Sequence, residues 1–219
     1  MRALLSHVCE VFRLQECEHL ASNSIQLLGW HLVYSSDRKA SIALRGKSCH
    51  NIVRSWSNHA RLAMVCLRHP CIFLVSAYFP NRSENRSLEV AFEMLKTIET
   101  TYRRWKEECR YTCELVIAGD FNVELAPDIT CSGGTVTGGA VQILDGRGYG
   151  NDTEDRRWEE DMWRSQLQEW LCRMRLLAVN SLGSPYSRQP TFVHRANNAR
   201  RKSGAKTIAP KVLDYLMVP

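Results

Sequence analysis

The amino-acid sequence predicts an α/β layered sandwich, because strand-type segments and amphipathic helical patterns alternate along the chain. Short runs rich in Val, Ile, Leu and aromatic residues recur, and two longer segments repeat apolar residues at helical spacing. The 219 residues are 44% hydrophobic and 24% charged, values typical of a soluble globular protein. We therefore expect a single domain over residues 1–219 rather than a disordered or fibrous chain.

The predicted strands are bounded by turn-forming residues. Arg68-His69-Pro70 predicts the turn of a hairpin between two of them. The segment from Asp128 to Asp155 is rich in Gly and Thr and predicts a long surface excursion. The strand segments, in chain order, are Val11–Gln15, Trp30–Ser35, Ser41–Leu44, Arg61–Leu67, Cys71–Phe79, Glu114–Asn122, Leu176–Ser181, Thr191–His194 and Val212–Val218.

Two segments predict helices, from Glu84 to about Glu108 and from Arg156 to Arg175. In both, apolar residues recur three or four positions apart and form one stripe, which favours packing against a core. The stripe of the first helix contains Val90, Met94, Leu95, Ile98 and Tyr102, and that of the second contains Trp163, Leu167, Trp170, Leu171 and Met174.

Charge and cysteine usage point to an intracellular protein. The net charge of +6 suits a polyanionic partner, although many basic proteins have none. The nine cysteines include no CxxC pair, and Cys109 with Cys113 lacks a second pair at zinc spacing. We expect reduced thiols and a nuclear or cytoplasmic location. No run approaches the ~18 apolar residues of a membrane span, and polar residues interrupt any signal-peptide core near Met1.

The chemistry-bearing feature of the chain is Leu115-Val116-Ile117-Ala118-Gly119-Asp120-Phe121-Asn122. A buried strand leads into Gly119, and Asp120 and Asn122 follow two positions apart, so in an extended chain they point the same way. An acid and an amide on one face can hold a phosphate together with a metal ion. A strand that runs into an Asx turn is the other interpretation, and the motif alone does not separate the two.

Three further strands carry polar residues at or near an end. Glu16 and Tyr78 each close an apolar run, although a solvated strand end and a packed ring with a hydrated hydroxyl are ordinary alternatives. Alternation places Asp214 on the face of Leu216 and Val218, an apolar setting in which a charge needs a partner.

In their order and approximate spacing, four segments resemble the endonuclease/exonuclease/phosphatase superfamily. They are Leu14-Gln15-Glu16, Tyr78-Phe79-Pro80-Asn81, Gly119-Asp120-Phe121-Asn122 and Leu213-Asp214-Tyr215. The resemblance implies a DNase I-like four-layer α/β sandwich over nearly the whole chain. Within the superfamily the chain is most similar to endonuclease domains of non-LTR retrotransposons, which are themselves similar to apurinic/apyrimidinic endonucleases.

The resemblance also implies a chemistry, that of a Mg²⁺-dependent phosphodiesterase, with Mn²⁺ as an alternative ion. Glu16 would ligate the metal, and Asp120 would orient or deprotonate the attacking water. Three residues would contact the phosphate or the nucleic-acid backbone: Tyr78, Asn81 and Asn122.

The sequence departs from the family pattern at both ends. In the family an asparagine precedes the Leu-Gln-Glu element, whereas the fifteen residues before Glu16 contain none. The family also has a later Ser-Asp-His element whose histidine is oriented by the equivalent of Asp214, and this chain stops at Pro219 without it. We therefore expect a domain that is truncated at both termini, with weak or no turnover.

The function expected from these observations is that of a retroelement DNA endonuclease, with nucleic acid as the partner and no membrane. A different phosphoesterase of the same fold, such as an RNA deadenylase or an inositol-phosphate phosphatase, stays open. So does a catalytically silent remnant that only binds nucleic acid. The acid-free basic segment from Arg195 to Lys211 fits either a phosphate-backbone contact or a solvated loop.

Overall fold

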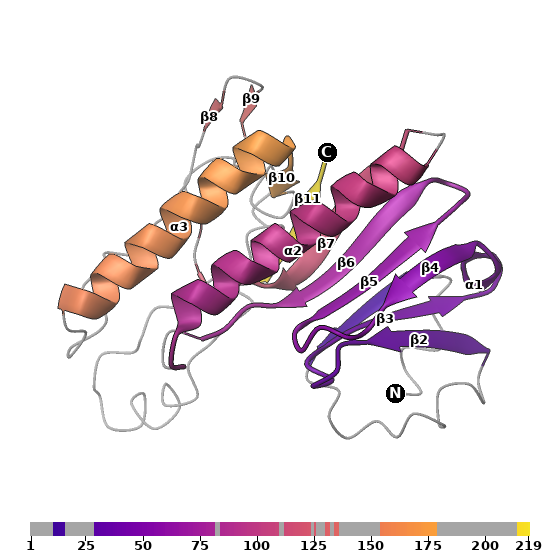
Figure 1. The fold of residues 1–219 in the computed structure, drawn as a ribbon, viewed down its shortest axis with the longest axis horizontal. Coiled ribbons are helices and arrows are strands. Elements are labelled where there is room, and N and C mark those ends of the chain that lie inside the picture. Colours follow the sequence, from indigo (N-terminus) through magenta and orange to yellow (C-terminus); the bar gives the residue numbers. More distant parts are fainter. Residues whose placement is uncertain are drawn as a thin grey trace, which may run out of the picture. The chain divides into compact units, whose positions relative to one another are not determined.

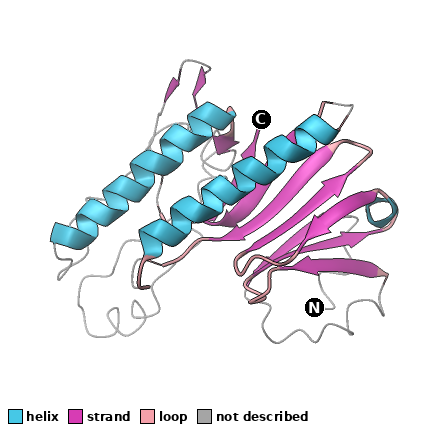
Figure 2. Cartoon of the chain, viewed as in Figure 1, coloured by secondary structure: helices cyan, strands magenta, loops and turns pink. Residues whose placement is uncertain are grey.

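The computed structural model describes only part of the chain, whose helices and strands are drawn in Figures 1 and 2. The chain divides into two compact units. The first unit contains Met1–Tyr78 and Thr97–Gly119, and the second contains Phe79–Lys96 and Asp120–Pro219. The prediction of a single domain is not tested by this division. The described residues are 11–15, 29–81, 84–109, 112–123, 125, 130–131, 134–135, 154–178 and 214–219. The predicted strand Thr191–His194, the basic segment Arg195–Lys211 and Glu16 lie outside them.

The first unit contains a three-stranded antiparallel sheet in the order β1-β3-β2. Its strands are β1 (Val11–Gln15), β2 (Trp30–Tyr34) and β3 (Ala40–Arg45), close to the predicted segments. The turn between β2 and β3 is held by Asp37, whose Oδ1 accepts hydrogen bonds from Ser35 Oγ at 2.8 Å and from Lys39 N at 3.0 Å. Such a local carboxylate bond is a common reason for a chain to reverse.

The second sheet of this unit has its strands in the order β7-β6-β5-β4. They are β4 (Ile52–Trp56), β5 (Leu62–Leu67), β6 (Ile72–Tyr78) and β7 (Glu114–Asp120), and the short helix α1 (Lys47–His50) precedes β4. The predicted hairpin between β5 and β6 is confirmed. Sequence analysis missed α1 and β4, because α1 is a single turn and the three central residues of β4 are exposed, as befits the strand at one end of this order.

Strands β6 and β7 run parallel. At one end Glu114 N donates to Cys71 O at 3.0 Å, and at the other Phe79 N donates to Asp120 O at 2.8 Å, so residue numbers rise together along both strands. Parallel neighbours bring their carboxyl ends to the same edge of a sheet. This arrangement positions the chain segments that follow β6 and β7.

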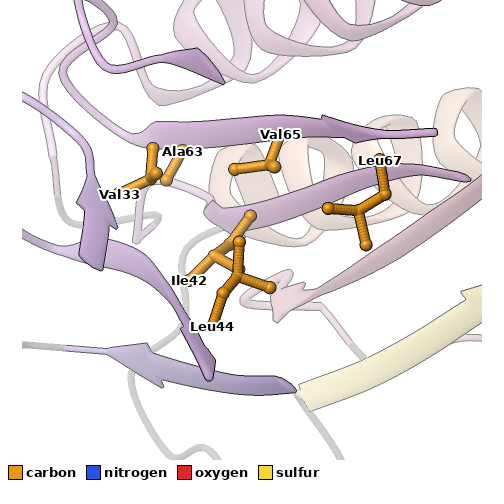
Figure 3. Packing of buried hydrophobic residues seen from close by; sticks show 6 residues of the cluster. All are labelled: Val33, Ile42, Leu44, Ala63, Val65 and Leu67. Carbon is orange, nitrogen blue, oxygen red and sulfur yellow. The ribbon is translucent and has the colours of Figure 1, made fainter. Parts of the chain in front are cut away.

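The core of the first unit lies between its two sheets. Strands β2 and β3 pack against β5, and their inward side chains form one cluster (Figure 3). Burying an aliphatic side chain of this kind stabilises a fold by about 1.5–3 kcal/mol. The cluster consists of Val33, Ile42 and Leu44 from the first sheet and Ala63, Val65 and Leu67 from β5.

Helix α2 (Ser87–Glu108) forms where the first helical pattern predicts it, and Met94, Leu95 and Ile98 of the predicted stripe are buried. In the first unit, the Tyr102 ring lies 5.8 Å from the ring of Phe73, and its hydroxyl donates to Cys113 O at 2.7 Å. Burial raises the pKa of the Tyr102 phenol, which favours the protonated form that makes this bond.

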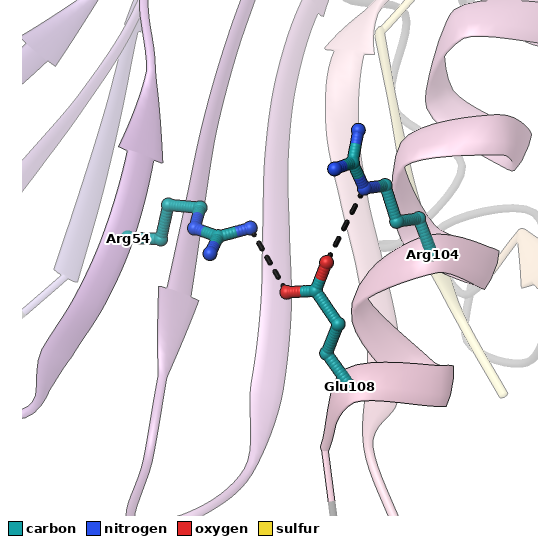
Figure 4. Close-up of polar contacts among 3 residues, drawn as sticks. All are labelled: Arg54, Arg104 and Glu108. Atoms are coloured by element: carbon teal, nitrogen blue, oxygen red, sulfur yellow. Dashed lines mark hydrogen bonds and ion pairs between the residues drawn. The ribbon is translucent and has the colours of Figure 1, made fainter.

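The carboxyl end of α2 carries a surface ion-pair network. Figure 4 shows the Glu108 carboxylate between two arginines, 3.0 Å from Arg54 Nη1 and 3.2 Å from Arg104 Nε. Exposed pairs of this kind contribute only about 0–1 kcal/mol each. The network therefore links β4 to α2 without being a main source of stability.

The second unit is built around α3 (Glu154–Met174), close to the predicted helix, and four of its predicted stripe residues are buried: Trp163, Leu167, Trp170 and Leu171. Strand β10 (Leu177–Ala178) pairs with β11 (Asp214–Val218), and β8 (Thr130–Cys131) pairs with β9 (Gly134–Thr135). Within the described residues, no helix combines the length and apolar composition that a membrane span requires.

Two expectations from the sequence are corrected. In β11, Met217 is fully buried whereas Leu216 is 41% exposed, so the face assigned to Leu216 is not the buried one. The side of β11 that holds Leu216 is therefore not the apolar setting that the sequence predicted. Among the described cysteines five are free thiols, as expected, but Cys172 of α3 is disulfide-bonded.

Candidate functional site

The site begins at Gly119, at the end of β7. A Cβ atom at this position would lie 2.4 Å from the backbone oxygen of Ala77 on β6. Because real Cβ atoms do not approach a backbone oxygen so closely, only glycine fits between these strands. Gly119 thus allows the tight approach of β6 and β7 directly before Asp120.

Asp120 and Asn122 form an Asx turn at the carboxyl end of β7. Asn122 N donates to Asp120 Oδ1 at 2.9 Å, and Asn122 has a φ of 50°, a left-handed conformation that Asn tolerates better than most residues. The interpretation as an Asx turn is therefore confirmed. It does not displace the phosphate-site hypothesis, because the same turn holds a carboxylate and an amide, both half-buried, two residues apart.

Two hydrogen bonds join this turn to the segment that follows β6. Asn122 Nδ2 donates to Phe79 O at 2.7 Å, and Phe79 N donates to Asp120 O at 2.8 Å. The side-chain bond fixes the plane of the Asn122 amide and uses one of its two N–H donors. The amide also has a second N–H, a donor of the kind that suits an acceptor such as a phosphate oxygen.

Aromatic rings pack beside the turn. Phe79 and Phe121 stack with their centroids 4.7 Å apart and an interplanar angle of 20°, and the ring of Trp163 lies 5.1 Å from that of Phe79. Trp163 Nε1 also donates to Phe121 O at 3.0 Å, a buried bond from α3 to the middle of the motif. Sequence analysis predicted Trp163 as a core residue but not this polar contact.

A cavity of about 20 Å³ lies beside the turn, enough for a water-sized group. Asn122, Pro80 and Trp163 line it together with Glu159 of α3. Sequence analysis did not select Glu159. The available signal was its position four residues before the buried Trp163, which places both side chains on one face of α3.

Tyr78 is half-buried in the first unit and has cations near its ring. Lys39 Nζ lies 5.4 Å and Arg61 Cζ 5.9 Å from the ring centroid, and Tyr78 N donates to Arg61 O at 3.1 Å. Two positive charges around a phenol suit an anionic ligand. Neither Lys39 nor Arg61 was selected from the sequence.

The remaining predicted residues are less constrained. Asn81 is exposed and its N–H donates to Glu84 Oε1 at 3.0 Å, while Glu84 N donates back to Asn81 O at 2.9 Å, a turn that leads into α2. Glu16 lies outside the described residues, and of Asp214 only the backbone in β11 is described.

The structure therefore brings together Asp120 and Asn122, beside Phe79, and tests none of the roles predicted for the site residues. Among the described side chains, no group of three or more His, Cys, Asp or Glu residues is arranged to hold a metal ion. Asp120, the acid of the predicted set whose side chain is described, offers carboxylate oxygens of the kind that Mg²⁺ prefers.

The Trp163 bond gives a direct test of how firmly the turn is held. Trp163→Phe keeps an aromatic ring but removes the indole N–H and with it the buried hydrogen bond to Phe121 O, and we expect the unfolding free energy to fall by about 1–3 kcal/mol. Urea denaturation measures the change. Trp158→Phe is the matched control, because Trp158 of the same helix is 59% exposed and its loss should change stability by no more than about 0.5 kcal/mol. Equal effects of the two variants would contradict the role of the bond.

The comparisons with known proteins identify the fold. No family model and no curated protein matches the sequence. Among solved structures, a 3'-5' exonuclease from Neisseria meningitidis matches with a TM-score of 0.60 at 16% identity, covering 99% of this chain and 79% of that one. Another structure of the Neisseria protein, bound to a product DNA hairpin, matches with a TM-score of 0.58 at 15% identity, with the same coverage.

Two further structures match over most of their length. An AP endonuclease from Archaeoglobus fulgidus has a TM-score of 0.54 at 14% identity, covering 95% of this chain and 76% of that one. The endonuclease domain of TRAS1, a telomere-specific non-LTR retrotransposon, has a TM-score of 0.54 at 16% identity, with 96% and 73% covered. At sequence identities of 14–16%, the matches establish the fold alone. This chain therefore has the DNase I-like fold that its ordered motifs predicted.

Proposed function

We propose that the chain is a nucleic-acid phosphodiesterase, specifically a Mg²⁺-dependent DNA endonuclease of a retroelement. The observation that carries the proposal is the hydrogen-bonded turn of Asp120 and Asn122 at the carboxyl end of β7. It presents an acid and an amide in a fixed orientation on a fold whose solved examples above include DNA-processing enzymes.

The geometry supports a division of labour within the turn. Because Asn122 N holds one oxygen of the planar Asp120 carboxylate, the direction of the second oxygen is set as well. In this proposal that oxygen accepts the proton of the attacking water, a general-base role. The second N–H of the Asn122 amide donates to a non-bridging phosphate oxygen, whose charge grows during the reaction.

The metal enters the proposal through the chemistry of the donors. Carboxylate oxygens suit a hard cation, and Glu16 is the proposed ligand. When bound, Mg²⁺ would act as a Lewis acid on the phosphate oxygens. The roles of Tyr78, Asn81 and Asp214 remain those that the resemblance implies, and the charges of Lys39 and Arg61 around Tyr78 support an anionic substrate.

A substrate panel tests the proposal. The purified full chain is incubated with supercoiled plasmid, poly(A) RNA or inositol phosphates, each with Mg²⁺ or with EDTA. We expect slow nicking of the plasmid with Mg²⁺, in keeping with the weak turnover expected from the sequence, and none with EDTA, because the developing phosphate charge needs the cation.

Each other outcome contradicts the proposal in its own way. Hydrolysis confined to poly(A) would indicate a deadenylase, and phosphate release from inositol phosphates a phosphatase. Plasmid binding in a gel-shift assay without turnover would indicate a silent remnant. Nicking that survives EDTA would remove the metal from the proposal.

A further inference from the structure

Four cysteines of the first unit gather at one end of the sheet that contains β5, β6 and β7. Cys66 lies in β5, Cys71 directly precedes β6, Cys109 directly follows α2, and Cys113 directly precedes β7. In the sequence, no second pair of cysteines at zinc spacing accompanies Cys109 and Cys113. The fold brings Cys66 and Cys71 close to them.

Within this group, Cys71 and Cys109 differ from the other two cysteines because their sulfur atoms are close together and their side chains are more accessible. Their Sγ atoms are 3.2 Å apart, and both residues are half-buried, so a small reagent can reach them. Cys66 and Cys113 are 0% and 2% exposed. Burial raises the pKa of the Cys66 and Cys113 thiols, which keeps them protonated and inert.

The backbone on both sides of the pair is held in place. Cys71 O accepts the Glu114 amide at 3.0 Å, and Cys109 N donates to Trp105 O at 2.9 Å, the last such bond of α2. Both segments are therefore ordered around the pair, and an S–S bond of about 2.05 Å requires the sulfurs to close the remaining distance from 3.2 Å.

We propose that Cys71 and Cys109 form a redox-sensitive dithiol site that a low-molecular-weight disulfide of the glutathione type converts to a disulfide. The pair is independent of the proposed phosphodiesterase activity.

The exchange proceeds in two balanced steps. The Cys109 thiol loses its proton, its thiolate attacks one sulfur of glutathione disulfide, and one glutathione leaves as a thiolate. Cys71 then loses its proton and attacks Cys109 Sγ, which releases the second glutathione. Two protein thiols are oxidised, and one glutathione disulfide is reduced to two glutathione thiols.

The order of attack follows from the surroundings of Cys71. Burial, followed by hydrogen bonds to Cys109 and Cys113, raises the pKa of Cys71 to about 12. A thiol so rarely ionised is a poor initial nucleophile. Cys71 therefore acts second, on a sulfur that the fold already holds beside it.

The test follows the unaltered full chain. The reduced protein is equilibrated in buffers of rising glutathione disulfide content, quenched in acid, alkylated and mapped by mass spectrometry of its peptides. We expect a peptide linked through Cys71 and Cys109 to accumulate, with Cys49, Cys66 and Cys113 alkylated throughout. The melting temperature should rise by about 5–10 °C as the bond forms, because it closes a long loop of the unfolded chain.

Variants and the opposite results make the test decisive. Cys109→Ser should abolish the peptide linked through Cys71 and Cys109 and should lower the rise in melting temperature to the part that comes from re-forming the Cys172 disulfide. Cys49→Ser should change neither, because Cys49 lies in α1 and its thiol donates to Leu44 O at 2.9 Å. Continued alkylation of Cys71 and Cys109 at every buffer ratio, or linkage of Cys71 to Cys113 instead, would overturn the proposal. The test measures the linked peptide and not DNA cleavage. Its result therefore stands even if the chain proves not to cleave DNA.

Discussion

Replacing Asp120 by alanine is expected to lower the rate of Mg²⁺-dependent plasmid nicking by about 10²–10⁴-fold, the usual contribution of a general base. The Asp120 carboxylate is held in a fixed direction at the end of β7, because Asn122 N donates to its Oδ1 at 2.9 Å. The measurement is the initial rate of conversion of supercoiled to open-circular plasmid, with the unaltered chain assayed in parallel.

The alanine variant also removes the acceptor of a turn hydrogen bond, so Asp120→Asn is needed beside it. Asparagine keeps an oxygen that can accept from Asn122 N but has no negative charge, and the folded turn should survive. We expect Asp120→Asn to be as slow as Asp120→Ala, while only the alanine variant loses about 0.5–1.5 kcal/mol of unfolding free energy. A nicking rate within a few-fold of the unaltered chain for Asp120→Asn would exclude the carboxylate as the base.

Gly119→Ala is expected to destabilise the fold by at least about 3 kcal/mol, at or above the upper end of the usual cost of overpacking. The added Cβ would lie 2.4 Å from Ala77 O and 3.1 Å from Ala77 C, both backbone atoms of a sheet strand. A flexible side chain could move away, but a backbone that belongs to the sheet cannot. Urea denaturation of the variant gives the change in unfolding free energy.

Gly29→Ala is the matched control for this effect. Gly29 has a φ of 72°, so alanine there is strained, but no atom lies within 4 Å of the added Cβ. Its cost should stay at about 1–2 kcal/mol, the penalty of a left-handed conformation alone. If both variants lose the same stability, the close approach of β6 and β7 is not what requires glycine at position 119.

Local patterns were sufficient for most of the secondary structure. The buried stripes of α2 and α3 and the fully buried β5 follow from apolar spacing alone. Strand β4 was not predicted because Arg54 and Ser55 at its solvent-facing centre interrupt the run of apolar residues that indicates a strand. Helix α2 begins at Ser87 rather than Glu84, because Glu84 is bonded to Asn81 in the turn before the helix.

The candidate site divides in the same way. Asp120 and Asn122 could be selected because they lie two residues apart at the end of a predicted strand. The extended conformation expected at Asn122 is not found, since β7 ends at Asp120 and Asn122 has a φ of 50°. The bond from Asn122 to Phe79 spans 43 positions and that from Trp163 to Phe121 spans 42, and no local pattern encodes either. For the same reason Glu159 beside Asn122 and the positive charges around Tyr78 were not foreseen.

The sequence by itself determined the fold class, because residue type and apolar period dictate which segments form strands and helices. It also determined the order of the motifs that mark the DNase I-like fold. Only the tertiary structure decided that the Asn122 amide is fixed by Phe79, that Trp163 supports the motif, and that Cys71 meets Cys109. These contacts depend on how whole elements pack, and packing joins residues whose separation along the chain carries no periodic signal.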